Sequence, residues 1–294
     1  MTYQAHCIVP HQAQLGEGPV WDSRRGILYY VDITAKEIHC YDPASGTCRT
    51  ISTQQMPGCI VPDISGRLVA AETNTLVQID PDNGARRELQ RLALPEFVRF
   101  NDGKCDAAGR LLAGTMAADQ SHPESKTCGA FYALADGKPP RVLRQNMAIP
   151  NGIAFSGDNQ FLYHTDTPTQ QIIRYAYGPA DGSLTDPQPV ITIPGADGSP
   201  DGMTIDCEGM LWIALWGGYQ VARYNPATGQ KLDSIAVPAR FVSCCTFGGP
   251  DLQDLFITTA MDDDGGGGEL YVCRTHTHGF APYPYQYQTE EDNA

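Results

Sequence analysis

The sequence lacks the short motifs that mark several common hydrolases and nucleotide-binding proteins. Its 294 residues contain no G-x-S-x-G segment, no H-E-x-x-H pair and no glycine-rich phosphate loop. These absences exclude an elbow-type serine hydrolase, a zinc protease of the H-E-x-x-H class and a P-loop nucleotide-binding protein. Any hydrolytic chemistry therefore needs a different arrangement of side chains.

Basic residues are scarce. The chain has 20 Lys and Arg against 34 Asp and Glu, which gives a formal net charge of −14 at pH 7. Such a surface repels phosphate backbones and anionic lipids, so we expect no nucleic-acid partner and no membrane partner. A neutral or cationic small molecule fits this charge better, and nothing in the sequence indicates an obligate protein partner.

Long apolar runs are also missing. No stretch of 18 consecutive apolar residues occurs, and the first residues, MTYQAHCIVPHQAQ, have no basic segment followed by an apolar run of signal-peptide length. We therefore expect a cytoplasmic protein.

The ten cysteines form no C-x-x-C pair and no regular framework, and many stand inside apolar, strand-like runs. A disulfide scaffold or a Cys-rich metal site would need such spacings. We expect the cysteines to be reduced, buried and structural.

A repeated unit is the strongest pattern in the chain. It recurs at roughly 40 to 50 residues, the period of a propeller blade. Each copy has a short apolar strand, a turn with Asp, Ser or Gly, and a second strand with large apolar residues. The copies begin at GPVWDSRRGILYYVD, GCIVPDISGRLVAAE, DGKCDAAGRLLAGTM, NGIAFSGDNQFLYHTD, DGMTIDCEGMLWIAL and CCTFGGPDLQDLFITT.

Six copies, most followed by a third strand and a polar turn ending in Gly, predict an all-β, six-bladed β-propeller. A β-sandwich is the alternative, but sandwiches rarely repeat one unit six times. The N-terminal strand at residues 3–9 is expected to pair with the last blade and close the ring, which hides a strand edge. The sequence thus predicts one propeller domain over residues 1–287 and a disordered tail at residues 288–294.

Equivalent positions in the six copies should lie on one ring around the propeller axis. Five residues before the turn, this position holds Glu17, Gly58, Asn101, Asn151, Asp201 and Cys244. Four of the six carry side-chain oxygens, where packing alone would be satisfied by small or apolar residues. The pattern therefore predicts a ring of converging oxygen ligands.

Turn chemistry is the alternative explanation, because Asn and Asp tolerate unusual backbone angles and each of these residues precedes Gly or Asp-Gly. The shared register across four copies favours a cation, since two carboxylates and two amides that face one point need opposite charge. Oxygen ligation suits Ca²⁺, Mg²⁺ or Mn²⁺, with Zn²⁺ and Fe²⁺ also open. We expect one divalent metal ion as cofactor.

At these residues the sequence resembles the gluconolactonase and regucalcin (senescence marker protein) family of six-bladed propellers. The similarity extends from LGEGPVWD through RFNDGKCDAAGRLLAGTM, IPNGIAFS and SPDGMTID to SCCTFGGPDLQDLFITTA and GFAPYPY. The HTDT and LWGG segments are closer to bacterial aldonolactonases than to animal regucalcin. This favours a catabolic enzyme.

The resemblance implies a role for individual residues. It implies that Glu17, Asn151 and Asp201 hold the metal and that Arg99 and Asn101 contact the sugar. An acidic residue after AGTM contacts substrate in the family, which here points to Asp119, although with a shorter side chain. A surface position is the alternative for Arg99.

The predicted chemistry is metal-dependent hydrolysis of a sugar (aldono-)lactone to the aldonic acid. A cyclic ester needs a polarised carbonyl, an activated water and stabilisation of the oxyanion, and one metal can supply all three. The resemblance makes Asp201 the candidate general base, and we expect it to be ionised beside a dication. The alternatives are a calcium-binding regulatory protein of the regucalcin type and a hydrolase of other esters.

Overall fold

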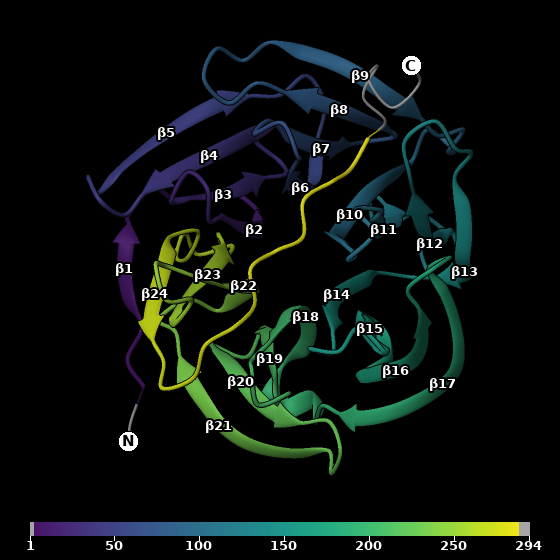
Figure 1. Cartoon of the computed structure of the whole chain (residues 1–294). Helices are drawn as coiled ribbons and strands as arrows, with labels where there is room; N and C mark the ends of the chain where they lie inside the picture. The colour runs from purple at the N-terminus through teal and green to yellow at the C-terminus, as the bar shows by residue number, and fades with distance from the viewer. Residues whose placement is uncertain (1–2, 288–294) are drawn as a thin grey trace.

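The chain folds almost entirely into short antiparallel strands arranged as a ring of sheets (Figure 1). The structure is a computed structural model, and it describes residues 3–287. The predicted tail at 288–294 lies outside the described residues. Four sheets have four strands each and a fifth has eight. The predicted all-β fold of small antiparallel sheets, typical of a propeller, is confirmed.

The four smaller sheets follow one another along the chain. The first contains β2 (Gly16–Asp22), β3 (Ile27–Asp32), β4 (Glu37–Asp42) and β5 (Thr47–Ser52). The second contains β6 (Pro57–Pro62), β7 (Leu68–Glu72), β8 (Thr75–Ile79) and β9 (Arg86–Arg91). The third contains β10 (Val98–Cys105), β11 (Leu111–Ala117), β12 (Gly129–Leu134) and β13 (Arg141–Met147). The fourth contains β14 (Pro150–Phe155), β15 (Phe161–Asp166), β16 (Gln171–Gly178) and β17 (Ser183–Thr192).

The eight-stranded sheet has two halves. One half contains β18 (Ser199–Ile205), β19 (Leu211–Trp216), β20 (Gln220–Asn225) and β21 (Gln230–Ala236). The other contains β22 (Phe241–Gly248), β23 (Asp254–Ala260), β24 (Leu270–Arg274) and β1 (His6–Val9). A single pair, Trp216 with Phe241, joins the halves. Two 3₁₀ turns, η1 (Thr167–Thr169) and η2 (Gly195–Asp197), flank β16 and β18.

The innermost strands close a ring. Strands β2, β6, β10, β14, β18 and β22 contact one another in this order, and β22 contacts β2. At the seam, β1 pairs antiparallel with β24. The predicted pairing of the N-terminal strand with the last sheet is therefore confirmed, and the strand covers the edge that β24 would otherwise expose.

Buried aspartates explain why the first turn of the repeat recurs. Asp63, Asp106 and Asp206 are fully buried, and Oδ1 of each accepts the backbone N–H groups two and four residues later at 2.8–3.0 Å. The Gly three residues after each aspartate has φ of 87°, 74° and 79°, a left-handed conformation that glycine adopts without strain. The Asp-x-x-Gly spacing thus fixes the hairpin geometry of these copies.

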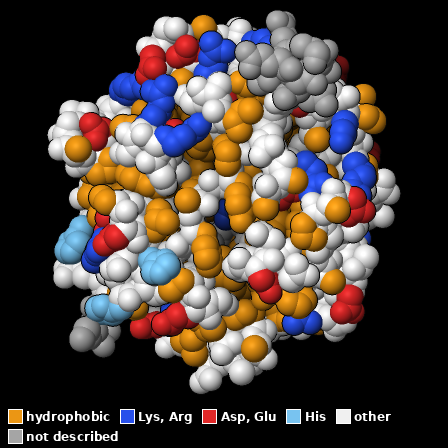
Figure 2. Space-filling model, in the orientation of Figure 1, with side chains coloured by type: hydrophobic (Ala, Val, Ile, Leu, Met, Phe, Trp, Pro, Cys, Tyr) orange, Lys and Arg blue, Asp and Glu red, His pale blue; other side chains and the backbone are white. Residues whose placement is uncertain are grey.

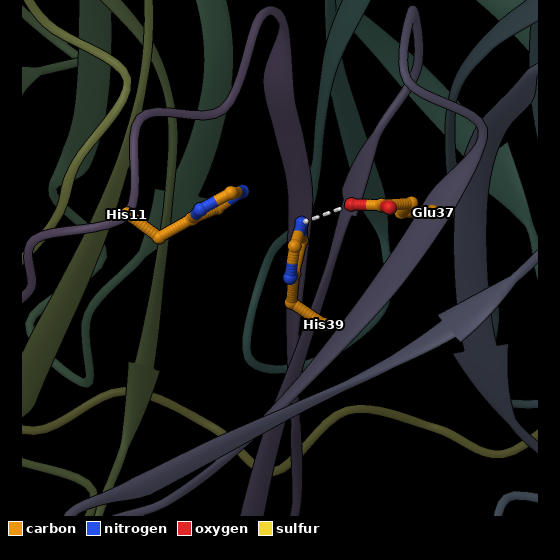
Figure 3. Close-up of side chains that lie close together, drawn as sticks. All are labelled: His11, Glu37 and His39. Carbon is orange, nitrogen blue, oxygen red and sulfur yellow. Dashed lines mark ion pairs between the residues drawn. The ribbon is translucent and has the colours of Figure 1, made fainter.

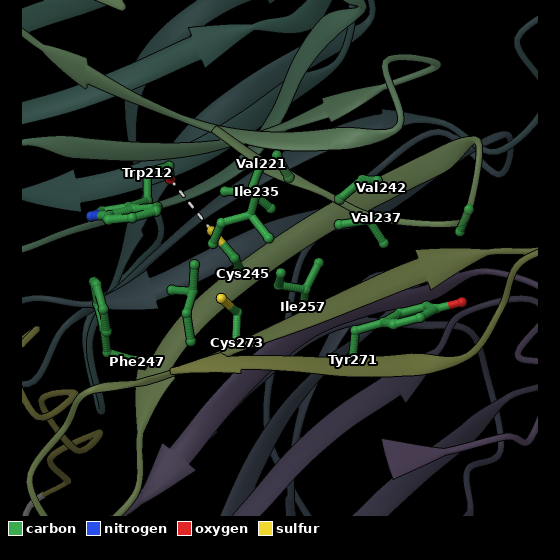
Figure 4. Close-up of a cluster of buried hydrophobic side chains, with 13 residues drawn as sticks. Trp212, Val221, Ile235, Val237, Val242, Cys245, Phe247, Ile257, Tyr271 and Cys273 are labelled. Atoms are coloured by element: carbon green, nitrogen blue, oxygen red, sulfur yellow. Dashed lines mark hydrogen bonds between the residues drawn. The ribbon is translucent and has the colours of Figure 1, made fainter. Parts of the chain in front are cut away.

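The core lies between successive sheets. A cluster of 13 buried side chains joins β19–β21 to β22–β24, with Trp212 and Phe247 in edge-to-face contact at 6.0 Å between ring centroids (Figure 4). On the other side of β22–β24, Trp21 of β2 stacks on Phe256 of β23 at 5.8 Å. Because each sheet packs on both neighbours, the ring is held by apolar contacts on every side.

The C-terminal segment crosses one face of the ring, over the innermost strands (Figure 1). It forms isolated bridges from Tyr285 to Asp63 and from Gly279 to Asp206, both of which directly follow an innermost strand. Figure 2 shows hydrophobic side chains spread across the middle of this face. The segment therefore lies at the turn end of the innermost strands. Within residues 3–287, no helix is long and apolar enough to cross a membrane.

All ten cysteines are free thiols. Six are buried, as expected for structural cysteines, but Cys7, Cys48 and Cys207 are exposed. The prediction of burial was wrong for these three because Cys7 and Cys48 lie in the outer strands β1 and β5 and Cys207 lies in a turn, where side chains face solvent.

Candidate functional site

A cavity of about 330 Å³ lies at the starts of the innermost strands, at the end of the ring opposite the C-terminal segment. Four residues of the predicted ring line it together: Glu17, Asn101, Asn151 and Asp201. Arg99 and Trp216 add a cation and an aromatic ring, and the remaining wall is mostly apolar. A mostly apolar cavity with a few converging polar groups is the usual form of a small-molecule site.

Irregular pairing at the starts of the innermost strands places these side chains. Every innermost strand has a register shift near its beginning, for example between Glu17 and Val20 and between Asn151 and Ile153. A β-bulge turns its strand and re-aims the side chains beside it. The ring of polar residues is thus produced by a structural feature that all six copies share.

Two members of the predicted ring do not line the cavity, each for a physical reason. A Cβ at Gly58 would lie 2.5 Å from the carbonyl oxygen of Phe100, so the close approach of β10 leaves no room for a side chain. Cys244 lies beyond the shift in β22 and lines a different cavity, further along the strands, with Asp102 and Lys104. These two positions, which were not predicted as ligands, thus add no side chain to the cavity.

The two candidate carboxylate ligands are buried. Glu17 and Asp201 are 7% and 6% exposed, and Oδ1 of Asp201 has no hydrogen-bond partner among the described residues. Burial, followed by the charge of Asp102, raises the pKa of Glu17 to about 8. Burial, followed by the charges of Glu17 and Asp102, raises the pKa of Asp201 well above its ordinary value. The site thus concentrates acidic groups that no protein cation fully neutralises.

A chain of hydrogen bonds fixes the side chains of Asn101 and Asn151. Arg99 Nη1 donates to Asn101 Oδ1 at 2.9 Å, and Asn101 Nδ2 donates to Asn151 Oδ1 at 2.7 Å. Asn151 Nδ2 donates to Thr167 Oγ1 at 3.0 Å, and Thr167 donates to the Pro200 carbonyl at 2.8 Å. Because both NH₂ groups have acceptors, the amide oxygens are oriented, and Asn151 Oδ1 keeps a second lone pair for another partner.

Arg99 is a cavity residue. It is 6% exposed, which excludes the surface position considered as the alternative. Its Nη1 also donates to the Phe100 carbonyl at 2.8 Å, so the guanidinium is anchored beside the cavity. Burial lowers its pKa to about 10, which leaves it charged at neutral pH.

Asp119 is placed differently. It is exposed and does not line the cavity, whereas its neighbours Ala118 and Gln120 do. Its Oδ1 accepts the Ser121 N–H at 2.8 Å in the turn that follows β11. A contact between Asp119 and a bound sugar stays a prediction.

Two residues important to the site were not singled out from the sequence. Asp102 is buried, and its charge raises the pKa of both Glu17 and Asp201. Its position directly after Asn101 in an Asn-Asp-Gly segment was the available signal. Thr167, which orients Asn151, follows β15 in the HTDT segment, but no spacing rule links it to the ring.

The donor set fits a divalent cation. Two buried carboxylates and one oriented amide oxygen are oxygen ligands, and burying such a group of charges without a counter-ion is costly. The unpartnered Oδ1 of Asp201 is the observation that a ligand role explains best. Glu17, Asn151 and Asp201 are therefore suited to hold the ion, and Asn101 lies beside them with its Oδ1 bound to Arg99.

Comparisons with known proteins show the family of the chain. Residues 15–261 match the model of the SMP-30/Gluconolactonase/LRE-like region. The chain is 35% identical over 93% of its length to a Bacillus subtilis protein whose name, sugar lactone lactonase YvrE, is given as provisional; 96% of that protein is covered. It is 34% identical over 89% of its length to pentonolactonase XacC of Haloferax volcanii, with 87% of that protein covered.

A solved structure extends the comparison. The calcium-binding protein regucalcin of Agrobacterium tumefaciens superposes with a TM-score of 0.90 at 26% identity, covering 97% of this chain and 99% of that one. The sequence match spans most of the chain and includes every residue that lines the cavity. The chain therefore belongs to the SMP-30/gluconolactonase/LRE-like family.

Proposed function

We propose that this protein hydrolyses a sugar lactone at the cavity formed by the starts of the innermost strands, with one divalent cation held by Glu17, Asn151 and Asp201. The observation that carries the proposal is the buried, unpartnered Asp201 Oδ1 beside a second carboxylate in a cavity of small-molecule size. Family membership and relatives named as lactonases support the same reaction class.

The residues of the cavity can each be assigned a role in ester hydrolysis. A bound divalent cation would polarise the lactone carbonyl and lower the pKa of a nearby water. Asp201, ionised beside a bound cation, would accept the proton that this water loses as it attacks the carbonyl carbon. The C–O bond of the ring then breaks, and the leaving ring oxygen takes that proton back from Asp201 to give the open hydroxy acid. Asn101 and Thr167 hold Asn151 in place, so the ligand geometry is set before substrate binds.

Arg99 and Trp216 are suited to orient the sugar. The anchored guanidinium of Arg99 can donate several hydrogen bonds to hydroxyl groups. Trp216 lines the same cavity and stacks on Phe241 at 4.3 Å, which fixes its ring as a flat apolar wall. A flat apolar wall with a donor beside it suits a polyhydroxylated ring more than an extended ester.

Proton release on addition of glucono-, xylono-, arabinono- and galactono-lactone, followed with and without chelator, tests the proposal. We expect rapid hydrolysis of at least one lactone, loss of activity on chelation and recovery on return of Ca²⁺, Mg²⁺, Mn²⁺, Zn²⁺ or Fe²⁺. Hydrolysis that persists unchanged in chelator would contradict the metal dependence. No hydrolysis of any lactone with every metal would contradict the enzymatic function.

A calcium-binding role of the regucalcin type is the second candidate, because a solved relative is described as a calcium-binding protein. The buried oxygen ligands would serve this role equally well. Tight Ca²⁺ binding with no lactone turnover would favour it.

We also propose that the architecture is a six-bladed propeller that forms one domain over residues 1–287. The single pair between β19 and β22 separates the eight-stranded sheet into two groups of four strands, each like the four smaller sheets. Six innermost strands in mutual contact support the same number. An experimental structure with one blade more or fewer would refute it.

A further inference from the structure

Three metal-ligating side chains meet at the surface, away from the proposed lactone site. His11 comes from the segment that connects β1 to β2, and Glu37 and His39 come from β4. One ligand atom from each lies within 4.8 Å of the other two. Figure 3 shows that His11 and Glu37 point toward the same end of the His39 ring from opposite sides.

The sheet holds His39 rigidly in this arrangement. Glu37 and His39 are two residues apart in one strand, so their side chains leave the same face. On neighbouring strands, Tyr30 and Thr50 pair directly with His39. Tyr30 stacks on the imidazole at 4.7 Å between centroids, and Thr50 Oγ1 lies 3.2 Å from His39 Nδ1.

These contacts do not involve the second ring nitrogen of His39, Nε2. His39 is 2% exposed, and Nε2 is buried without a hydrogen-bond partner in the described structure. Its distance to Glu37 Oε2 is 3.5 Å, longer than a normal hydrogen bond. If Nδ1 donates its proton to Thr50, Nε2 carries a lone pair directed at the cluster. A metal-bound histidine has its other nitrogen engaged in this way.

We propose that His11, Glu37 and His39 form a second metal site, for Zn²⁺ or a similar divalent transition ion. Two imidazoles and one carboxylate are a common Zn²⁺ ligand set, with a water in the fourth position. Tetrahedral Zn²⁺ ligands about 2.0–2.2 Å from the ion lie ~3.4 Å apart. His39 and Glu37 already have this separation at 3.5 Å, and a ligand atom of the exposed His11 lies within 4.8 Å of both, from where the side chain can move closer.

These ligands also differ in chemistry from those proposed for the central cavity. Ca²⁺ and Mg²⁺ prefer sets made of oxygen atoms, whereas imidazole suits Zn²⁺, Cu²⁺ and Ni²⁺. The central cavity contains no histidine among its lining residues. The two sites should therefore differ in metal preference.

The place of the cluster in the fold gives the ion a structural role. His11 lies in the short connection between β1, which belongs to the last sheet, and β2, the first strand of the first sheet. The next two residues bind the loop before β24, where Gln12 Nε2 donates to the Gly265 carbonyl and Ala13 N donates to the Gly268 carbonyl, both at 2.9 Å. An ion bound by His11 and β4 would fasten this connection to the first sheet across the closure of the ring.

The test uses the full chain with its exposed thiols first blocked by iodoacetamide, because thiolates also bind Zn²⁺. Zn²⁺ binding is measured by equilibrium dialysis in excess Ca²⁺, and the melting temperature is measured in parallel. The variants are His11→Ala and Glu37→Gln. His6→Ala, which removes an exposed histidine of β1 outside the cluster, is the matched control.

We expect wild type and His6→Ala to bind Zn²⁺ and to gain thermal stability from it. In His11→Ala and Glu37→Gln the affinity of this site should fall by about 10- to 100-fold or more, with lactone hydrolysis in Ca²⁺ unchanged. Equal Zn²⁺ binding in wild type and both variants overturns the proposal. So does an equal loss in His6→Ala, which would indicate scattered surface histidines.

Discussion

Asp201 is assigned two tasks, metal ligand and general base, and a pair of substitutions separates them. Asp201→Asn keeps an oxygen that can touch a cation but cannot accept a proton at neutral pH. Glu17→Gln removes a ligand charge from the same cavity without removing the proposed base. Both side chains are buried, at 6% and 7% exposure, so the two replacements change matched environments at nearly constant volume.

The structure sets the expected size of the difference. Each substitution removes one of two carboxylates from the ligand set, so both variants should bind the metal more weakly. Only Asp201→Asn also removes a proton acceptor, which contributes about 10²- to 10⁴-fold to a rate. This corresponds to ~2.7–5.4 kcal/mol of activation free energy. At metal saturation, Glu17→Gln should recover most of kcat and Asp201→Asn should not.

The assay is proton release at saturating lactone across a metal titration that extends until kcat is constant. Circular dichroism of each variant checks that the fold is intact. A kcat for Asp201→Asn that rises at saturation to within a few-fold of Glu17→Gln would refute the base assignment. The attacking water would then lose its proton without help from Asp201.

Four further results are expected. Arg99→Ala should lower kcat/KM for hydroxyl-rich lactones by about 10- to 100-fold and change an unsubstituted lactone much less, since the hydrogen bonds proposed for Arg99 are to substrate hydroxyl groups; equal losses would remove Arg99 from sugar recognition. Chelation should abolish turnover while the far-ultraviolet circular dichroism spectrum is retained, because the sheets pack through apolar clusters; wholesale unfolding would contradict this. Asp206→Ala should lower the free energy of unfolding, measured in urea, by about 3–5 kcal/mol, because the buried Asp206 carboxylate pairs with Arg223 at 2.7 Å. Asp251→Ala, which removes an exposed carboxylate paired with Arg274, should lower it by under about 1 kcal/mol. Similar losses in the two variants would refute the argument. Tyr224→Phe should stabilise the protein by about 1 kcal/mol, since the Tyr224 hydroxyl is buried without a partner in the described structure. Burial raises the pKa of Tyr224 to about 12 from 10.0, so the unfolded chain loses this proton first and wild-type stability falls between pH 10 and 12; Tyr224→Phe should lack that part of the fall, and identical pH profiles would contradict it.

The repeats predicted the fold because each copy contains the residues that determine its own strands and turns. Asp63, Asp106 and Asp206 stand at equivalent positions and bind equivalent backbone N–H groups. The inner strands of the copies are buried along their length, as β2, β6 and β11 show. Contacts within one hairpin therefore repeat wherever the sequence does, and the all-β organisation follows from them.

The cavity was predictable only where its residues obey the same spacing. Glu17, Asn151 and Asp201 occupy the shared position at the start of an innermost strand, and they meet in the cavity. Cys244 does not line the cavity because the shift in β22 lies earlier in that strand relative to its turn, so counting back five residues from the turn stopped short of the bend. Gly58 adds no side chain to the cavity, and the backbone of β10 occupies the space that a side chain would need.

Contacts between elements that are distant in the sequence could not be predicted from the repeat spacing. Asp102 raises the pKa values of Glu17 and Asp201 across the ring, and the repeat spacing does not relate these three positions.

The second metal site combines residues that the local spacing could place with one that it could not. Glu37 and His39 could be placed on one face of a strand from their two-residue spacing, and Tyr30 and Thr50 could be placed beside His39 once the hairpin registers were known. His11 joins them only because β1 pairs with β24 and the chain must then cross from the last sheet to the first. A site at the seam of a closed ring thus depends on the closure itself, and this explains why the repeat pattern, which treats all copies alike, gave no sign of it.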